Sequence, residues 1–430
     1  MSTLKKAIVS TGQRLRERSV LIVGYGIYVA LLSAGYYYNL TFVQLGLIDI
    51  GTRRVAMSEG EVSAAMAAFA LTAFAAAAVS GWMMDRKGWS SDLRIKLRAL
   101  FGVVAAQTVL TLMAVRVQSE GVFLAWMGAA SLAIGVGIPA SFSLMSDFIP
   151  VRHRGAIAAL VAGLAFFVAA LYPIQWRVEE FAPLMGVVMV PAAMGLGVVS
   201  FRSTHLVDRL ALQHERFGRG RFCYPTPVAT SSFTFWGLVI LMFAVFFIDS
   251  LGFLRIIDAP VYISTSWQSP EVGVRVFIAM THVLGALIAG VLYTVFEKRW
   301  LFLWIFGLFA FTHLLYTFHI ATAPSGLEPP LVLPFFYVLA VSFYTTLNFA
   351  LWPDLSTSDN VGLHTALGVG IAGWLASFLS TSLALRSSEA GHSLLEHLRY
   401  VNALALLLAV GYPAFLYLRR MRILLREGES

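Results

Sequence analysis

An aspartate lies in the middle of a long apolar segment. Asp249 is surrounded by Phe246, Phe247, Ile248 and Leu251. A carboxylate inside a membrane-crossing helix is costly, so it is a functional hypothesis by default. Burial favours the protonated form of a carboxylate, and we therefore expect Asp249 to take up and release a proton. The alternative is that Asp249 caps a helix kink or meets an arginine from another part of the chain.

The nearest charges on the same segment are Arg255 and Asp258. On a straight helix, with 3.6 residues per turn, Arg255 points well away from Asp249. Arg255 is better placed to pair with Asp258, three residues further on. We therefore predict that Asp249 has no partner on its own helix.

Polar side chains in the first apolar segment are the counterpart of this acid. Asn39 precedes Asp249 by 210 residues and occupies the equivalent place in the first half of the chain, but an amide cannot titrate. The neighbouring rings of Tyr36 and Tyr37 belong to an aromatic run that covers all faces of its helix. At least one ring must therefore face a cavity or a partner helix.

Two further polar residues lie in later apolar segments. His282 is on a face of small residues, where it either relays protons near neutral pH or is fixed by packing. Asn348 can bind a substrate or a backbone group, and the sequence does not decide which. His313 and His319 are expected to be packing residues.

The residue pattern does not support metal binding, nucleophilic catalysis or phosphate binding. No metal-ligand spacing, nucleophile triad or phosphate-binding loop occurs, and Cys223 is the only cysteine, which excludes a disulfide within the chain. We expect a protein that is not an enzyme and that holds no cofactor and no metal.

The composition indicates the elements that position these residues. The chain is 58% hydrophobic and only 13% charged, against about 25% charged in soluble domains, and its mean hydropathy is +0.77. Apolar runs of about 20 residues can cross a bilayer as helices. We predict an all-α integral membrane protein with twelve transmembrane helices at residues 20–44, 62–83, 98–115, 122–145, 156–176, 183–201, 233–256, 272–296, 300–319, 331–350, 363–384 and 398–418.

The distribution of positive charge predicts the topology. Of the 31 lysines and arginines, 23 fall in the loops and ends on one side of this arrangement, which places both termini in the cytoplasm and the protein in the inner membrane. The net charge of +8 is therefore a topology signal and does not indicate nucleic acid. The expected parts are a lead-in (1–19), a six-helix bundle (20–201), a linker (202–232), a second six-helix bundle (233–418) and a cytoplasmic tail (419–430).

An internal repeat relates the two halves. Residues 142–163 and 349–370 share seven residues at an offset of 207. Among them are two pairs that can act in loops, Asp147 with Asp354 and Gly155 with Gly362. Such a repeat predicts two pseudo-symmetric bundles, the architecture of many transporters.

Two loop motifs carry a family resemblance. The turn from Gly81 through Asp85, Arg86 and Gly88 is similar to the signature loop of the major facilitator superfamily, and the turn from Asp147 to Gly155 is similar to its second cytoplasmic signature. Both lie in the matching loops of a twelve-helix chain with a central linker. The resemblance covers nearly the whole sequence, although the subfamily is not identified.

The resemblance implies the fold of this superfamily and a secondary transporter. Its two bundles would move a small organic solute across the lipid bilayer by alternating access, with protons as one choice of coupling ion, and it would act as a monomer. The signature loop would work as a latch between the bundles; the alternative is that Asp85 and Arg86 only maintain the topology. Asp85, at a helix end, can pair with Arg86 or Arg154 or cap a neighbouring helix. A protein of this fold that has lost transport and acts as an assembly factor or sensor is the alternative.

Overall fold

The computed structural model describes residues 19, 22–171, 177–202, 228–257, 259–296, 298–323 and 328–428. Helices make up most of these ranges, and no strand occurs in them. All of the predicted lead-in except Ser19, most of the predicted linker with Cys223, and Asp258 lie outside the described residues.

Each of the twelve predicted spans corresponds to a helix. The first helix covers residues 22–54. The others are α2 (Glu59–Arg86), α3 (Leu93–Ala114), α4 (Glu120–Phe148), α5 (Arg154–Leu171), α6 (Val178–Phe201), α8 (Phe233–Ile257), α9 (Val272–Val295), α10 (Lys298–Thr322), α11 (Val332–Asp354), the continuous series α12 (Val361–Leu367), η7 (Gly368–Leu375) and α13 (Ala376–Glu389), and α14 (Leu394–Gly428). Eleven helices of the described chain, besides the first, are long and apolar enough to cross a membrane. Helices suit this environment because they satisfy their own backbone hydrogen bonds.

The first helix is longer than predicted. It continues past residue 44 through two π-helical stretches, Asn39–Gly46 and Asp49–Arg54. Arg53 and Arg54, expected in a loop, sit on its last turn. Arg53 is paired with Asp49 at 2.6 Å and with Glu179 at 2.6 Å, and Arg54 also binds Glu179. Arginine is a good helix former and is favourable in a last turn, so charge that ends the apolar segment does not end the helix.

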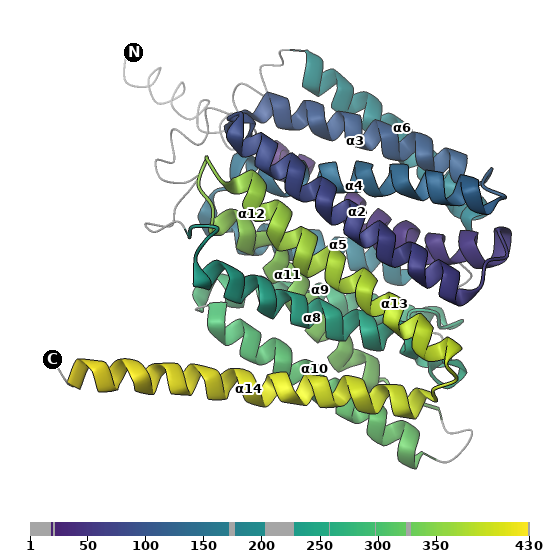
Figure 1. Cartoon of the computed structure of the whole chain (residues 1–430), viewed down its shortest axis with the longest axis vertical. Helices are drawn as coiled ribbons and strands as arrows, with labels where there is room; N and C mark the ends of the chain where they lie inside the picture. Colours follow the sequence, from purple (N-terminus) through teal and green to yellow (C-terminus); the bar gives the residue numbers. More distant parts are fainter. Residues whose placement is uncertain are drawn as a thin grey trace, which may run out of the picture.

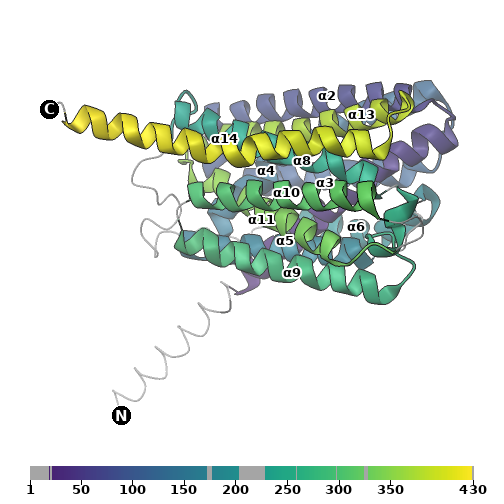
Figure 2. The ribbon, with the colours of Figure 1, turned by 90° about the horizontal axis from the view of Figure 1, so that it is seen from below.

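The last helix also differs from the prediction. We expected it to end at residue 418 and to be followed by a separate tail, but α14 continues to Gly428. It projects past the ends of the other helices on one side of the molecule (Figures 1 and 2). No helix-breaking glycine or proline interrupts residues 414–427, which accounts for this continuation.

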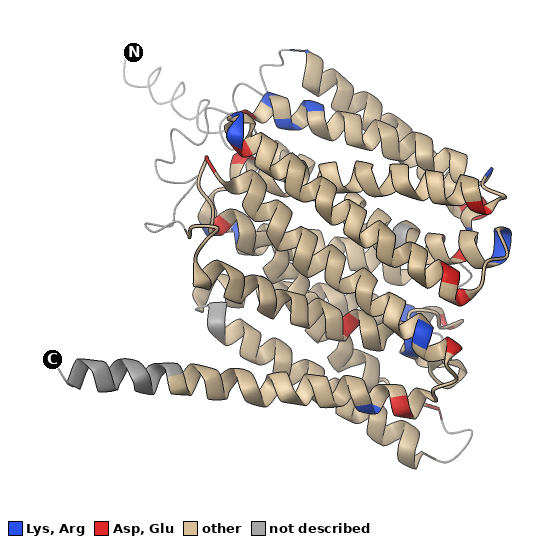
Figure 3. Ribbon diagram, viewed as in Figure 1, with Lys and Arg blue, Asp and Glu red and all other residues tan. Residues whose placement is uncertain are grey.

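The helices form two groups that follow the order of the chain. The first helix and α2–α6 make one group, and α8–α14 make the other, as the colour change across Figure 1 shows. Two pairs of helices carry most of the contact between the groups: α5 packs on α9, and α2 packs on α12 and α13. Figure 3 shows that charged residues gather at the two ends of the helices and leave the middle largely uncharged, as a bilayer requires.

Candidate functional site

A cavity of about 170 Å³ lies between the two groups of helices, far larger than the roughly 10–15 Å³ that one water molecule needs. One wall comes from the first helix, α4 and α5, and the other from α8, α9, α11, η7 and α13. The polar or titratable side chains in the wall are Tyr36, Asn39, Thr41, Asp249, Ser250, Trp267, His282, Tyr344, Asn348, Trp374 and Ser377. The cavity therefore brings together five of the six predicted substrate or coupling residues.

Asp249 is buried in α8 and has two hydrogen-bond partners from α11. The hydroxyl of Tyr337 donates to Asp249 Oδ1 at 2.6 Å and to its backbone oxygen at 2.9 Å, and the hydroxyl of Tyr344 donates to Oδ2 at 2.5 Å. Among the described residues, Asp249 thus has no side-chain partner on its own helix, as predicted, but it does have two partners on a neighbouring helix, which the sequence did not predict. The two tyrosines are seven residues apart, which is about two helical turns, so both face α8 from the same side of α11.

No cation pairs with Asp249 among the described residues. Arg255 instead donates from one guanidinium nitrogen to the backbone oxygen of His392 at 3.0 Å. Its predicted pairing with Asp258 lies outside the described residues. The carboxylate is therefore held by neutral donors, and its charge has no counter-ion in the described wall of the cavity.

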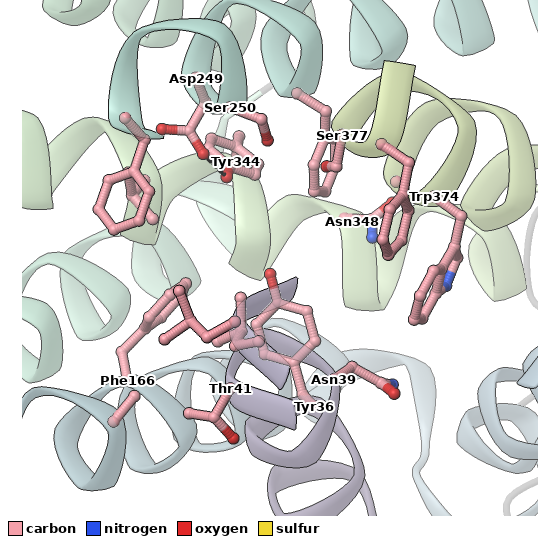
Figure 4. A pocket seen from close by; sticks show the side chains of 18 of the residues that line it. Tyr36, Asn39, Thr41, Phe166, Asp249, Ser250, Tyr344, Asn348, Trp374 and Ser377 are labelled. Carbon is pink, nitrogen blue, oxygen red and sulfur yellow. Dashed lines mark hydrogen bonds between the residues drawn. The ribbon is translucent and has the colours of Figure 1, made fainter. Parts of the chain in front are cut away.

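Asn39 lies on the opposite wall, in the π-helical part of the first helix. Its Oδ1 atom is buried and has no hydrogen-bond partner among the described residues. Figure 4 shows the hydroxyl of Tyr36 pointing from this wall toward Asp249 and Ser250, whereas the polar ends of Asn39 and Thr41 point away from them. Tyr37 is the exception among the predicted residues. It is buried inside its own bundle, where its ring packs against Phe181.

Asn348 presents its amide group to the same cavity from α11. Its Oδ1 accepts a hydrogen bond from the indole nitrogen of Trp352 at 2.8 Å. The –NH₂ group is therefore the part of the side chain that remains free to bind a ligand. Trp352 is in turn fully buried against Gly368, where a methyl group would lie 2.1 Å from the indole ring.

His282 is fixed by three contacts. The indole nitrogen of Trp267 donates to Nε2 at 3.1 Å, Nδ1 lies 3.0 Å from the hydroxyl of Ser342, and the imidazole stacks on Phe166 with 6° between the rings. Because an indole N–H can only donate, Nε2 must accept, and the ring proton is on Nδ1. The imidazole is therefore neutral in this structure, which agrees with the packing interpretation of His282.

The two halves meet on an aromatic layer next to the cavity. Phe142 of α4 and Phe349 of α11 stack with their centroids 5.3 Å apart and 6° between planes. Tyr36 meets Phe349 edge to face at 5.1 Å. The two phenylalanines are the first matched pair of the internal repeat, so the pseudo-twofold axis passes between their rings.

Asp85 joins the bundles at the predicted cytoplasmic end. It lies at the end of α2, and its carboxylate accepts hydrogen bonds from the backbone nitrogens of Gly362 at 2.9 Å and Leu363 at 2.7 Å, and from the hydroxyl of Ser90. Asp85 thus caps the first turn of α12, which was one of the open interpretations. Arg86 does not pair with it, since its guanidinium lies over the ring of Trp82 at 5.0 Å.

Glycines allow this approach. A methyl group on Gly81 would lie 2.5 Å from the carbonyl oxygen of Gly362, so only glycine lets α2 and α12 come so close. Gly155 of α5 and Gly290 of α9 repeat this arrangement, with 2.7 Å from an added methyl on either to the carbonyl oxygen of the other. Gly88 adopts φ +70°, the left-handed conformation that the tight turn after α2 requires.

A buried ion pair accompanies the second glycine contact. Arg154 at the start of α5 donates to Asp354 at the end of α11 at 2.7 Å, and the hydroxyl of Tyr293 donates to the other carboxylate oxygen at 2.6 Å. Arg154 is fully buried. Asp147, the repeat partner of Asp354, instead pairs with buried Lys96 inside the first bundle. Of the two equivalent acids, therefore, Asp354 forms an ion pair across the bundles, and Asp147 forms one within its own bundle.

No metal site is evident in the described ranges, where no group of three or more His, Cys, Asp or Glu side chains could hold an ion.

Comparisons with known proteins identify the architecture. No family model and no curated protein matches the sequence. Solved structures do match. The proton:xylose symporter XylE bound to 6-bromo-6-deoxy-D-glucose matches with a TM-score of 0.59 and 15% identity over 91% of this chain and 95% of that one. The human organic anion transporter MFSD10 (TETRAN) matches with a TM-score of 0.58 and 14% identity over 92% and 99%.

A bacterial homologue of the iron transporter ferroportin, in the outward-facing state, matches with a TM-score of 0.52 and 14% identity over 93% of this chain and 98% of that one. Each of these three alignments covers nearly the full length of both chains. This multi-pass membrane chain therefore has the fold of the major facilitator superfamily.

Proposed function

We propose that this protein is a secondary active transporter that moves a small organic solute across the inner membrane by alternating access. The observation that carries the proposal is the cavity between the bundles, with the carboxylate of Asp249 on one wall and the hydroxyl of Tyr36 opposite it (Figure 4). The three matching structures are of transporters, which supports the same assignment. Both termini would be cytoplasmic, as the charge bias requires, and the monomer would be the working unit.

The contacts at the predicted cytoplasmic end supply the moving part of this mechanism. The Asp85 cap on α12 and the Arg154–Asp354 pair both join the two bundles. We expect both to break when the cavity opens to the cytoplasm and to form again when it closes. This is a two-state element whose equilibrium a bound solute can bias.

Proton coupling is the second part of the proposal. Asp249 lies in the cavity wall with two tyrosine donors and without a counter-ion in the described residues. Protonation would remove the only carboxylate charge of that wall. Because such a change alters what the cavity binds, a proton gradient could drive accumulation of the solute through this residue.

The proposal can be tested without knowing the solute. Cys223 is the only cysteine, so Cys223→Ser gives a background for spin labels at introduced cysteines. One pair, at exposed Lys87 and Asp359, reports the predicted cytoplasmic end, and another, at Glu59 and Ala390, reports the opposite end. Alternating access predicts two populations in which one distance lengthens as the other shortens.

The readout separates a transporter from the alternative. Distances would be measured in lipid nanodiscs at high and low pH and with the signature-loop variant Asp85→Asn. A single fixed distance at both ends under all these conditions would contradict transport and favour an assembly factor or sensor of the same fold.

A further inference from the structure

The charge balance of the cavity wall limits what it can bind. Asp249 is its only carboxylate, and no lysine or arginine occurs among the described residues that line it. His282 adds no positive charge, because Trp267 donates to its Nε2 atom. An anionic solute would therefore meet an uncompensated negative charge in a low-dielectric site, which is strongly unfavourable.

The carboxylate retains capacity for a cationic partner. An ionised carboxylate has about four lone-pair positions. One position on each oxygen is taken by the hydroxyls of Tyr337 and Tyr344. The remaining positions can accept from an ammonium group, and the two tyrosines keep the carboxylate in a fixed orientation for it.

The remainder of the wall is rich in aromatic rings. Faces and edges come from both bundles, from Tyr36, Phe166, Phe246, Phe253, Trp267 and Trp374 among others. The rings of Phe246 and Tyr344 pack edge to face with centroids 4.5 Å apart directly beside Asp249. A cation within about 6 Å of an aromatic face gains about 0.5–2 kcal/mol, most when water is excluded. Aromatic rings around one carboxylate are the combination that recognises alkylammonium groups.

Taken together, these features assign a substrate class. We infer that the solute is an amphipathic organic cation whose ammonium group binds at Asp249 between Tyr344 and the aromatic wall. The inference rests on the proposed transport function and makes it more specific. Because the aromatic rings around such a ligand come from both bundles, its binding can bias the bundles toward closure around it.

Competition with protons follows from the same geometry. A protonated Asp249 carries no charge to attract the ammonium group, so the cation and a proton would exclude each other from this residue. The titratable groups packed around Asp249 are Tyr337 and Tyr344 of α11, Tyr36 of the first helix, His282 of α9, His313 of α10 and His397 of α14. We expect binding of a permanent cation to weaken as the pH falls.

The test compares three probes that carry one ring and different charge. Benzyltrimethylammonium, benzyl alcohol and benzoate would be titrated into the purified full-length protein in nanodiscs by calorimetry. The cation should bind at least about tenfold more tightly than either of the others, equivalent to about 1.4 kcal/mol. Because benzyltrimethylammonium cannot titrate, any loss of its affinity at low pH reports a group of the protein.

Two variants make the test specific. Asp249→Asn should reduce the affinity for the cation to that for benzyl alcohol and abolish its pH dependence. Glu396→Gln is the matched control, since it also removes one negative charge but lies at the surface, bonded to Ser393. It should leave binding unchanged, and circular dichroism would check that both variants fold.

Each outcome decides the inference. Equal binding of cation and alcohol, tighter binding of benzoate, or pH-independent binding of the cation would overturn the substrate class. If the spin-label distances still alternate, the transport proposal survives that failure. If the cation binds as expected but the distances never change, the site is real and the transport proposal fails.

Discussion

Phe142 and Phe349 hold the same position in the two halves of the chain, and their rings stack on each other, 5.3 Å apart and nearly parallel. Equivalent residues can meet face to face only where the pseudo-twofold axis passes between them. The stack contacts Tyr36 through Phe349, and both Tyr36 and Phe142 line the cavity. The symmetry of the sequence thus places an aromatic plug beside the candidate binding site.

The first prediction concerns this plug. Phe349→Ala should make the cavity easier to reach from the cytoplasm, because an aromatic pair contributes about 0.5–1.5 kcal/mol beyond its buried area, up to about tenfold in a two-state equilibrium. A cysteine at Asn348, in the Cys223→Ser background, would then react faster with an impermeant thiol reagent in inverted vesicles. Phe253→Ala removes a cavity ring that packs on Trp267 and Tyr337 of the second bundle, and it should leave the rate unchanged.

The second prediction concerns the cap across the bundles. Asp85→Asn should weaken the contact to Gly362 and Leu363 and shift the population toward the inward-open state by about 1–3 kcal/mol, a typical coupling energy. The spin-label pair at Lys87 and Asp359 measures this shift.

A matched control exists for this variant. Asp92 also caps a helix, accepting from the backbone nitrogens of Arg94 and Ile95, but within the first bundle. Asp92→Asn should cost similar helix stability without changing the distance between bundles. If both variants move the distance equally, Asp85 is a topology residue and not a latch.

The third prediction compares two buried ion pairs. Arg154→Met and Lys96→Met each leave a buried aspartate without its cation, which typically costs about 3–5 kcal/mol of stability. Both variants should lower the melting temperature. Only Arg154→Met should increase the opening at the cytoplasmic end, because Lys96 pairs with Asp147 inside one bundle. Equal opening in both would show that general destabilisation, and not the cross-bundle pair, controls the equilibrium.

The fourth prediction is that Asp249 couples protons to the conformational cycle. In the wild-type protein a change of pH should shift the two spin-label distances, since protonation removes the charge of the cavity wall. Asp249→Asn keeps the shape and most hydrogen bonding but cannot titrate, so its distances should not respond to pH. Proteoliposomes that contain Asp249→Asn should also lose the gradient-driven accumulation of benzyltrimethylammonium. A normal pH response in Asp249→Asn would make this residue structural and move coupling elsewhere, with His282 the next candidate.

The fifth prediction tests the topology. An impermeant thiol reagent should label Cys223, the only cysteine, in inverted vesicles and not in intact cells. The basis is the concentration of lysine and arginine on the side of the predicted linker. Labelling from outside the cell would contradict both the helix count and the cytoplasmic placement of the termini.

The sequence by itself determined the helices and their symmetry. A segment in a bilayer must satisfy its backbone internally, so apolar length alone predicts a helix, and all twelve were found. The offset of 207 residues predicted the two halves. Helix ends were harder to predict. Arg53 and Arg54 end the apolar segment, but arginine is a good helix former, so the helix continues through them. Their partner Glu179 is distant in sequence.

Tertiary structure alone decided the partners of the functional side chains. Asp147 and Asp354 have the same local sequence, yet one pairs within its bundle and the other across it. The donors to Asp249 come from tyrosines on α11, about ninety residues away, which no periodicity in α8 could indicate. Local sequence sets the cost of burying a polar group, whereas the group that satisfies it depends on which helices pack side by side.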